Sequence, residues 1–376
     1  MARQELDFRQ PFQHICERYQ AIAGGLGVSA GIHVDLEAVR GAIADGASRD
    51  FVASRGEYLN GRILAAFLEA RFVDPEQAIL IGDDGRLRPE TYERLEPLLR
   101  GEGRFVVPGF YGSDLRGRVK TFSRGGSDLS GASVARAVEA AIYENWTDVP
   151  GFLMADPRIV PDAQPIREVT YRELRELAYM GASVLHDEAI FPVRERRIPI
   201  HIRNTNAPED PGTRIVAERN ATHSTVIGIA GLKGFTAITL EKALMNKERG
   251  FGRKFLEIIE GHGISFEHLP TGIDTISAVI REDELADKSE AVIEDVRRVL
   301  EPDRIELIPE LALLAVVGEG MAYRSGVAAR VSGSLGRGGV NVRLIAQGSS
   351  EISIIIGVAN ADYEKAVCAL YQEFVE

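Results

Sequence analysis

Residues 105–158 read FVVPGFYGSDLRGRVKTFSRGGSDLSGASVARAVEAAIYENWTDVPGFLMADPR, and this stretch decides the fold. The apolar run at 105–107 predicts a strand that ends at the Pro-Gly pair following it. After a hairpin-like segment, SRGGSD at 123–128 opens a helix of small residues, which we expect over 131–141. A strand, a glycine-rich turn and a helix in succession predict an α/β fold.

The glycine pair Gly125-Gly126 stands where that helix opens. Glycine lets backbone N–H groups approach an anion, and the helix dipole favours negative charge there. Arg124 adds a planar group that binds a carboxylate or phosphate through two hydrogen bonds. Most such turns are only tight connections, so the turn alone leaves a structural role open. Thr147-Asp148 follows the next expected strand, where open α/β sheets bind ligands.

The length and composition of the chain limit the number of domains, the class of partner and the cellular compartment. A chain of 376 residues is too long for one core and predicts two or three domains. The net charge of −12 argues against a nucleic-acid partner. Cys16 and Cys368 match no metal or redox spacing, which suits a reducing compartment. The sequence has no long apolar run and no signal-peptide pattern, so we expect a cytoplasmic protein without a membrane partner.

Several motifs taken together resemble the aspartate kinases of the amino-acid kinase fold, most closely those of the clostridial type. The motifs are GFYG at 109–112, SRGGSD at 123–128, WTDVPG at 146–151 and DPR at 156–158. The resemblance continues in SRGE at 54–57 and MGASVLH at 180–186, and it covers nearly the whole chain. It implies an αβα sandwich over residues 1–216 as the catalytic domain.

The first 50 residues depart from that family. They read as helices, with apolar residues at helical spacing. Aspartate kinases begin with a strand and a Lys-Phe-Gly-Gly-like turn, which this sequence lacks. We therefore expect an N-terminally truncated kinase fold without the lysine that neutralises the transferring phosphoryl group. This leaves open a second hypothesis, a catalytically impaired regulatory subunit that binds amino acids.

The resemblance implies a substrate site for L-aspartate. Glu57 would bind the amino group, although by itself it reads as a first-turn acid of a helix. Arg124 and Ser127 would bind the carboxylates, and Gly125 and Gly126 would supply backbone N–H groups.

The resemblance also implies ATP and Mg²⁺. Asp128 would lie near the metal-bound phosphates and, with Arg124, forms the expected catalytic pair; no side chain is assigned as a metal ligand. The expected nucleotide contacts are Thr147, Asp148, Leu153, Arg158, Ser183 and Val184. Leu153 stands where many relatives have Tyr, and Ser183 where many have Lys.

The second half of the chain contains a repeat. Gly250, Gly263 and Gly272 match glycines 76 residues later, at 326, 339 and 348. The first copy predicts strands at 237–240, 264–269, 275–280 and 304–308, with helices at 252–260 and 290–300. The second copy predicts strands at 313–316, 340–345 and 351–357, with helices at 327–335 and 363–375.

The second copy lacks a closing strand, and residues 225–230 form a spare one. Its simplest use is to complete the second copy, because an open sheet leaves backbone groups unpaired. The first ferredoxin-like βαββαβ unit, 232–311, is then inserted in the second, 217–231 plus 312–376.

With the kinase half, these units resemble the paired ACT domains of aspartate kinases, where end-product amino acids bind. The implied effector residues lie in the first copy: Met245, Glu248, Phe251, Phe266, Glu267 and Thr271. Met245 and Phe266 also fit a core role. Because ACT units commonly pair sheet edges between subunits, we expect a homodimer or a dimer of dimers.

The expected function is aspartate kinase. ATP would phosphorylate the side-chain carboxylate of L-aspartate to 4-phospho-L-aspartate, the first step to lysine, threonine and methionine, under feedback by lysine and/or threonine. A kinase of the same fold acting on glutamate, carbamate or UMP is an alternative, which the paired repeats and the SRGE motif disfavour. The absence of a Walker A pattern disfavours a P-loop ATPase.

Overall fold

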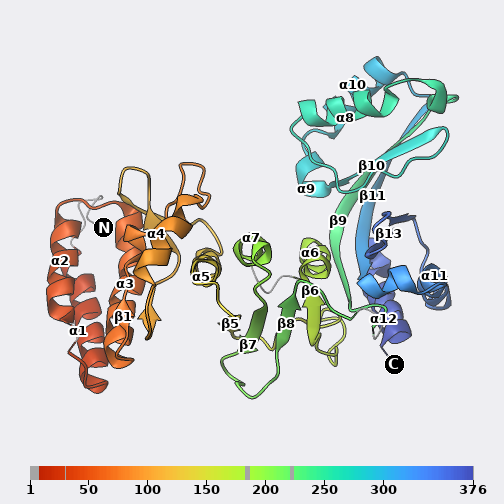
Figure 1. Cartoon of the computed structure of the whole chain (residues 1–376). Helices are drawn as coiled ribbons and strands as arrows, with labels where there is room; N and C mark the ends of the chain where they lie inside the picture. Colours follow the sequence, from red (N-terminus) through yellow and green to blue (C-terminus); the bar gives the residue numbers. More distant parts are fainter. Residues whose placement is uncertain (1–7, 30, 183–186, 221–223, 376) are drawn as a thin grey trace. The chain divides into compact units, whose positions relative to one another are not determined.

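The structure, a computed structural model, describes residues 8–29, 31–182, 187–220 and 224–375. Its chain forms two compact units (Figure 1). Unit 1 comprises Met1–Thr147, Leu185–Arg203 and Arg214–Ala217. Unit 2 comprises Asp148–Val184, Asn204–Thr213 and Glu218–Glu376.

Unit 1 begins with helices α1 (Arg9–Gly25), α2 (Ile32–Ala44) and α3 (Arg49–Phe67), which pack on one another. Their shared core includes Leu36 and Leu59, both almost fully buried. The helical prediction for the first 50 residues is therefore confirmed over its described part.

The rest of unit 1 alternates short strands with helices. The helices are α4 (Glu90–Leu98), α5 (Gly126–Ala137) and α7 (Asp187–Glu195), with the short helix η2 (Pro75–Gln77). The strands are β1 (Arg71–Phe72), β2 (Phe105–Val106), β3 (Tyr111–Ser113), β4 (Val119–Thr121), β5 (Tyr143–Thr147), β7 (Ile200–Asn204) and β8 (Thr213–Val216). β1 and β2 pair in parallel, β3 and β4 are antiparallel, and β5, β7 and β8 are neighbours in one sheet. The strands expected before the glycine turn and before Thr147 are both present.

Helix α5 begins earlier than predicted, at Gly126 rather than at residue 131, and it ends at Ala137 rather than at 141. The start is set by packing, because a Cβ on Gly126 would lie 2.8 Å from atoms of both Phe110 and Phe122. The end is set by Glu139, whose positive φ of 49° stops the helix without a glycine.

Unit 2 is built around a five-stranded sheet in the order β10-β9-β11-β13-β12. Its strands are β6 (Glu168–Thr170, outside that sheet), β9 (Gly228–Glu241), β10 (Thr275–Arg281), β11 (Arg304–Val317), β12 (Leu344–Gln347) and β13 (Ser353–Ala359). Its helices are α6 (Tyr171–Tyr179), α8 (Phe251–Gly261), α9 (Glu282–Leu285), α10 (Ser289–Leu300), α11 (Val327–Arg337) and α12 (Tyr363–Phe374). The short helices are η3 (Met245–Lys247), η4 (Glu319–Tyr323) and η5 (Asn360–Asp362).

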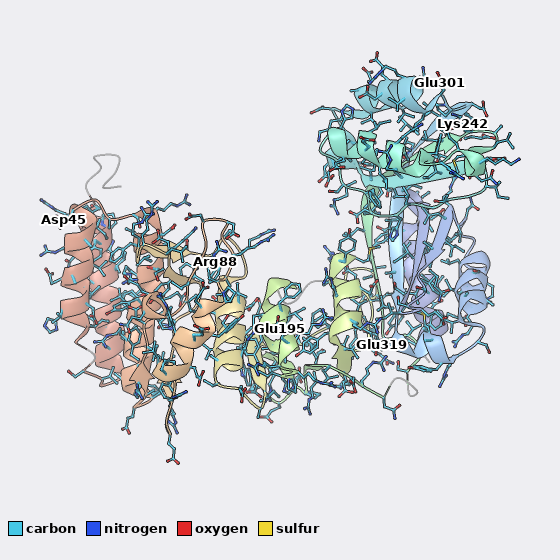
Figure 2. All side chains as sticks on the ribbon, turned by 45° about the horizontal axis from the view of Figure 1, so that its top comes forward. Asp45, Arg88, Glu195, Lys242, Glu301 and Glu319 are labelled. Carbon is cyan, nitrogen blue, oxygen red and sulfur yellow. The ribbon has the colours of Figure 1, made fainter. Side chains whose placement is uncertain are left out.

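Strands β9 and β11, each of 14 residues, run through both repeats. The first part of β9, 228–232, pairs with 313–317 of β11, and its last part, 237–241, pairs with 304–308. Lys242 and Glu319, just beyond the ends of the two strands, mark the opposite ends of this pair (Figure 2). The spare strand therefore completes the second repeat, and the nested arrangement is confirmed.

Two strand predictions need correction. Residues 264–269 do not form a strand, and the structure shows only single bridges at His268 and Thr271. Phe266 and its neighbour Ser265 are exposed there, so the apolar run is not a buried edge. The strand predicted at 340–345 lies instead at β12.

A buried ion pair ties α6 to the second repeat. Arg219 donates two hydrogen bonds to the fully buried Glu173, one of them 2.8 Å long. The same carboxylate accepts the backbone N–H groups of Thr170, at 2.9 Å, and Glu319, at 2.8 Å. Burial alone would raise the pKa of Glu173, but these hydrogen bonds outweigh it and the pKa is lowered.

Candidate functional site

The start of α5 packs tightly against the turn that follows β2. Gly125 caps the helix in the left-handed conformation, with φ 57°. A Cβ on Gly109 would lie 3.1 Å from the Cα of Ser127, so the two chain segments touch through glycine. The backbone N–H of Phe110 donates to Ser130 Oγ at 3.1 Å, which fixes the turn to the helix. The first N–H groups of α5 therefore belong to a rigid element.

Three of the predicted substrate residues are exposed, Glu57 on α3 and Arg124 and Ser127 at the start of α5, whereas Gly126 is buried. The side chains of Glu57, Arg124 and Ser127 make no hydrogen bond or ion pair with any other described residue. Several other arginines of unit 1 are paired with carboxylates, as Arg62 is with Asp35 at 3.1 Å. An exposed guanidinium without a carboxylate, beside helix N–H groups, can bind an anionic ligand at little cost.

Asp128 is half-buried in the first turn of α5 and is tied to β5. Asn145 donates to its carboxylate at 2.9 Å, and the Tyr143 hydroxyl donates to its backbone carbonyl at 3.3 Å. Burial raises the pKa of Tyr143 to about 12, so its hydroxyl remains a donor. A Cβ on Gly131 would lie 2.6 Å from that hydroxyl oxygen, which explains the small residues of the helix.

The SRGE motif contains a buried arginine whose role the sequence did not reveal. Arg55 is only 7% exposed, and its guanidinium lies over the rings of Tyr58, at 4.6 Å, and Tyr111, at 5.4 Å. The Tyr111 hydroxyl donates to Asp74 at 2.9 Å, and burial followed by this carboxylate raises its pKa. Arg55 thus anchors α3, while Glu57 on the same helix is exposed. In the sequence, only the aromatic residues at 51, 58 and 111 could have indicated that Arg55 is buried.

The predicted nucleotide residues fall in both units, and each is described within its own. Thr147 ends β5 in unit 1, whereas Asp148, Leu153 and Arg158 belong to unit 2. Ser183 and Val184 lie outside the described residues.

In unit 2, a cavity of about 350 Å³ is lined by Leu153, Arg158 and their neighbours. The guanidinium of Arg158 holds Asp156 through its Nε, at 3.0 Å and 3.1 Å from the two carboxylate oxygens. This contact lowers the pKa of Asp156. The side chain of Arg158 is nevertheless 88% exposed, so a phosphate can reach it.

The predicted effector residues separate into buried and exposed groups. Met245 and Phe251 are buried in the core of the first repeat. Phe266 is 42% exposed, and the Thr271 hydroxyl donates to the carbonyl of Leu269 at 3.1 Å.

The two acidic residues of this group are already bonded. Glu248 forms ion pairs with Lys242 at 2.8 Å and Lys254 at 3.2 Å, which lower its pKa. Glu267 accepts a hydrogen bond from the Tyr179 hydroxyl of α6; burial and then this carboxylate raise the pKa of Tyr179 to about 12. An ammonium ligand would add to these contacts or displace a lysine.

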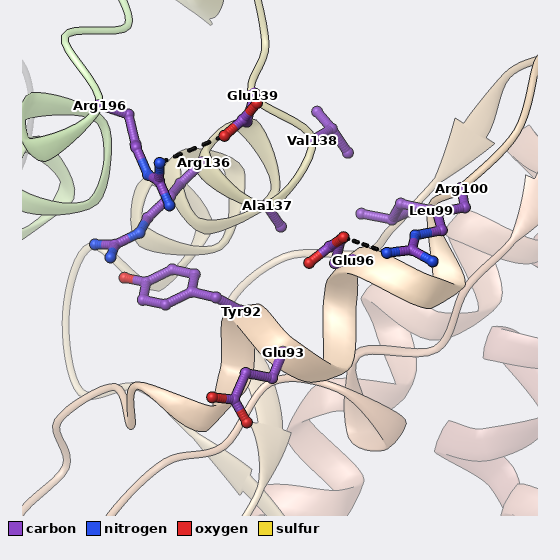
Figure 3. Close-up of a pocket in the computed structure, with 10 residues that line it drawn as sticks. All are labelled: Tyr92, Glu93, Glu96, Leu99, Arg100, Arg136, Ala137, Val138, Glu139 and Arg196. Atoms are coloured by element: carbon purple, nitrogen blue, oxygen red, sulfur yellow. Dashed lines mark hydrogen bonds and ion pairs between the residues drawn. The ribbon is translucent and has the colours of Figure 1, made fainter.

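Another cavity, of about 520 Å³, lies in unit 1 among α4, α5 and α7 (Figure 3). Its arginines are paired, Arg136 with Glu195 and Arg196 with Glu139. None of the predicted site residues lines it.

No three His, Cys, Asp or Glu side chains in the described ranges are grouped to hold a metal ion. No helix among the described residues has the length and apolar character needed to span a membrane.

Comparison with known proteins bears directly on this site. The amino acid kinase family matches residues 14–204, and an ACT domain family matches residues 314–374. Aspartokinase 3 of Bacillus subtilis is 42% identical over 335 residues, covering 86% of this chain and 74% of its own length. The chain spans 61% of chloroplastic aspartokinase 1 of Arabidopsis thaliana, at 32% identity, with 88% of this chain covered.

Solved structures point to the same family as the sequence relatives. The crystal structure of Clostridium acetobutylicum aspartate kinase superposes with a TM-score of 0.91 at 48% identity, covering 99% of this chain and 86% of that one. Escherichia coli aspartokinase III in complex with aspartate and ADP gives a TM-score of 0.67 at 28% identity, covering 92% and 81%. The predicted resemblance is confirmed: the chain is a kinase that belongs to the aspartokinase family.

Proposed function

We propose that this chain transfers the γ-phosphoryl group of ATP to the side-chain carboxylate of L-aspartate, giving 4-phospho-L-aspartate and ADP. The observation that carries the proposal is the exposed Arg124 without a carboxylate partner beside the Gly125–Gly126 helix start. The related E. coli enzyme has been solved with aspartate and ADP, which supports the same substrates here.

In this proposal the substrate is held by charge and by backbone N–H groups. Arg124 and Ser127 bind the carboxylates, the N–H groups of Gly125 and Gly126 assist, and Glu57 binds the ammonium group. A carboxylate oxygen of aspartate attacks the γ-phosphorus, and the bond to the bridging oxygen of ADP breaks. The attacking carboxylate is already ionised, so the residues have to position and neutralise charge rather than move a proton.

The nucleotide would be bound by Thr147, Asp148, Leu153, Arg158, Ser183 and Val184. Asp128 would face its phosphates. Mg²⁺ would offset charge on the β- and γ-phosphates when bound. A single half-buried carboxylate such as Asp128 fits this ion, because Mg²⁺ usually takes one or two carboxylates together with substrate phosphates.

The test is hydroxamate formation from aspartate, MgATP and hydroxylamine, which traps an acyl phosphate. Arg124→Ala should lower kcat/KM for aspartate about 10- to 100-fold, because charge-assisted hydrogen bonds are lost. Arg100→Ala, which removes an exposed arginine paired with Glu96, is the control and should have no effect. A wild-type chain that forms no hydroxamate yet binds lysine would be a regulatory subunit instead.

We further propose feedback by lysine, threonine or both, at Met245, Glu248, Phe251, Phe266, Glu267 and Thr271. E. coli aspartokinase III has been solved with lysine and aspartate in a T-state, and its chain is 27% identical with a TM-score of 0.68. Lysine must then bind one conformational state better than another. A calorimetric titration in which neither lysine nor threonine binds would contradict this part.

The remaining assignments follow from the family. We propose a catalytic domain at 1–216, an effector ACT domain at 232–311, and a dimerisation ACT domain at 217–231 plus 312–376. The protein would act in the cytoplasm as a homodimer or a dimer of dimers, supplying the route to lysine, threonine and methionine. Light scattering of the purified chain measures the oligomeric state.

A further inference from the structure

The segment that carries Leu153 and Arg158, two of the predicted nucleotide residues, is a closed loop in unit 2. Its base is formed by residues 152–154 and 164–166. The backbone N–H of Met154 donates to Gln164 at 2.9 Å, and that of Ile166 donates to Phe152 at 2.8 Å. Thr213 closes the base, since its hydroxyl accepts from the N–H of Phe152 and donates to the carbonyl of Ile166. These hydrogen bonds hold the two ends of the loop together.

This loop is part of the hydrophobic core of the second repeat. Ala155 is 1% exposed and belongs to the same core cluster as Val331 of α11 and Leu370 of α12. Ile159, Val160 and Ala163 pack against that cluster. The first part of β9 is joined to the loop as well, because Ile229 donates its backbone N–H to the carbonyl of Met154 at 2.7 Å.

Helix α12 also bonds the loop directly through Tyr371. The hydroxyl of this half-buried tyrosine accepts the backbone N–H of Gln164 at 2.9 Å and donates to the carbonyl of Asp162 at 3.3 Å. The ring packs against the core of the second repeat. One side chain near the end of the chain thus satisfies two polar groups of a loop more than 200 residues earlier.

The cavity beside Leu153 and Arg158 has its other wall in the same repeat. Residues 229–232 of β9 line it, together with Tyr363 of α12. The Tyr363 hydroxyl donates to the carbonyl of Gly231 at 2.6 Å, and a Cβ on Gly231 would lie 2.8 Å from the tyrosine ring. The wall is therefore closely packed, and its position follows that of α12 and β9.

We propose that Tyr371 is a positioning residue for the nucleotide: through it, the second repeat holds loop 152–166 and so sets the affinity for ATP. This inference rests on the proposed function, in which Leu153 and Arg158 bind the nucleotide. Tyr371 does not touch the cavity and acts through the loop.

The experiment compares Tyr371→Phe with the wild type. This variant keeps the ring and removes only the hydroxyl. We expect the KM for ATP and the calorimetric Kd for MgADP to rise about 5- to 10-fold, as losing two hydrogen bonds to the backbone would do. The KM for aspartate and kcat should stay within about twofold of the wild type. Tyr323→Phe is the control, because Tyr323 is 74% exposed and makes no hydrogen bond to another described residue.

Each outcome decides the matter. A selective change in the ATP and MgADP constants supports the positioning role. Equal changes in both Michaelis constants, or a lower melting temperature with an unchanged Kd for MgADP, would make Tyr371 a stabilising residue only and overturn the proposal. Failure of the wild-type chain to bind MgADP would instead overturn the nucleotide assignment of the proposed function.

Discussion

The two repeats of unit 2 share an order of elements, except that only the second has a strand, β12, after its first helix, and they differ in what their cores contain. The described core of the first repeat is built from its own residues, such as Phe255 and Ile259 of α8. The core of the second repeat also takes in Ala155 and the residues packed around it from loop 152–166. One fold therefore serves as a self-contained module in one copy and as a scaffold for another part of the chain in the other.

The largest expected loss of stability comes from breaking the buried ion pair of Arg219 and Glu173, which joins the second repeat to α6. Glu173→Ala leaves Arg219 buried without its carboxylate, which should cost about 3–5 kcal/mol of unfolding free energy. Chemical denaturation of the purified chain measures it. The exposed pair of Lys233 and Glu364 gives the control, and Glu364→Ala should cost at most about 1 kcal/mol. Equal costs for the two variants would contradict the importance of burial.

Equivalent core residues sharpen the comparison between repeats. Ile259 of α8 and Leu335 of α11 occupy matching positions 76 residues apart, and both are almost fully buried. Ile259→Ala and Leu335→Ala should each cost about 2–5 kcal/mol. Only Leu335→Ala should also raise the KM for ATP, because the core of the second repeat includes residues of loop 152–166. A rise in both variants would mean that the repeats do not differ in this respect.

Replacing the glycine at the start of α8 or of α11 by alanine should destabilise the protein by the same amount. Gly250 and Gly326 both have positive φ, 81° and 86°, and neither has an atom closer than 3.9 Å to an added Cβ. Alanine at either position should therefore cost only the left-handed backbone strain, about 1–2 kcal/mol. Thermal unfolding of both variants checks the equality. Gly336→Ala, in the last turn of α11 with open space around it, should instead stabilise by less than about 1 kcal/mol.

The buried ion pair of Glu173 and Arg219 should also make the unfolding free energy depend on pH, which is a smaller effect. The pKa of Glu173 is lowered below its ordinary value of 4.5 in the folded state. The ion pair therefore contributes fully above that value, and its contribution is lost as the pH falls through the folded pKa. Between about pH 6 and pH 3, the wild type should lose more unfolding free energy than Glu173→Gln. Parallel pH profiles would assign the acid sensitivity to other carboxylates.

The nested repeat could be predicted because backbone geometry left a mark on the sequence. Gly263 and Gly339 adopt nearly identical φ values, 63° and 62°, so their spacing reported a real structural equivalence. The turn before α5 could be predicted for a similar reason, because the positive φ of Gly125 favours glycine. Its start was placed late because Gly126 favours a helix poorly, and only contact with Phe110 and Phe122 explains it.

Other features depend on contacts between distant segments and leave no local pattern. The contact of Arg55 with Tyr111, 56 positions away, is one example, and only the rings of Phe51 and Tyr58 on the same helix gave a local signal of its burial. The attachment of loop 152–166 to α12 was equally hidden, because the sequence assigned the two to different domains.

The long strands β9 and β11 carry a consequence for protein engineering. Each is shared by both repeats, and their pairing shifts register at the bulge at Pro309 and Glu310 of β11 and again between Leu311 and Ala312. No loop separates the repeats, so neither can be exchanged alone without cutting a hydrogen-bonded ladder. A chimera that imports a new effector specificity must bring both strands with it, or be spliced at the bulge.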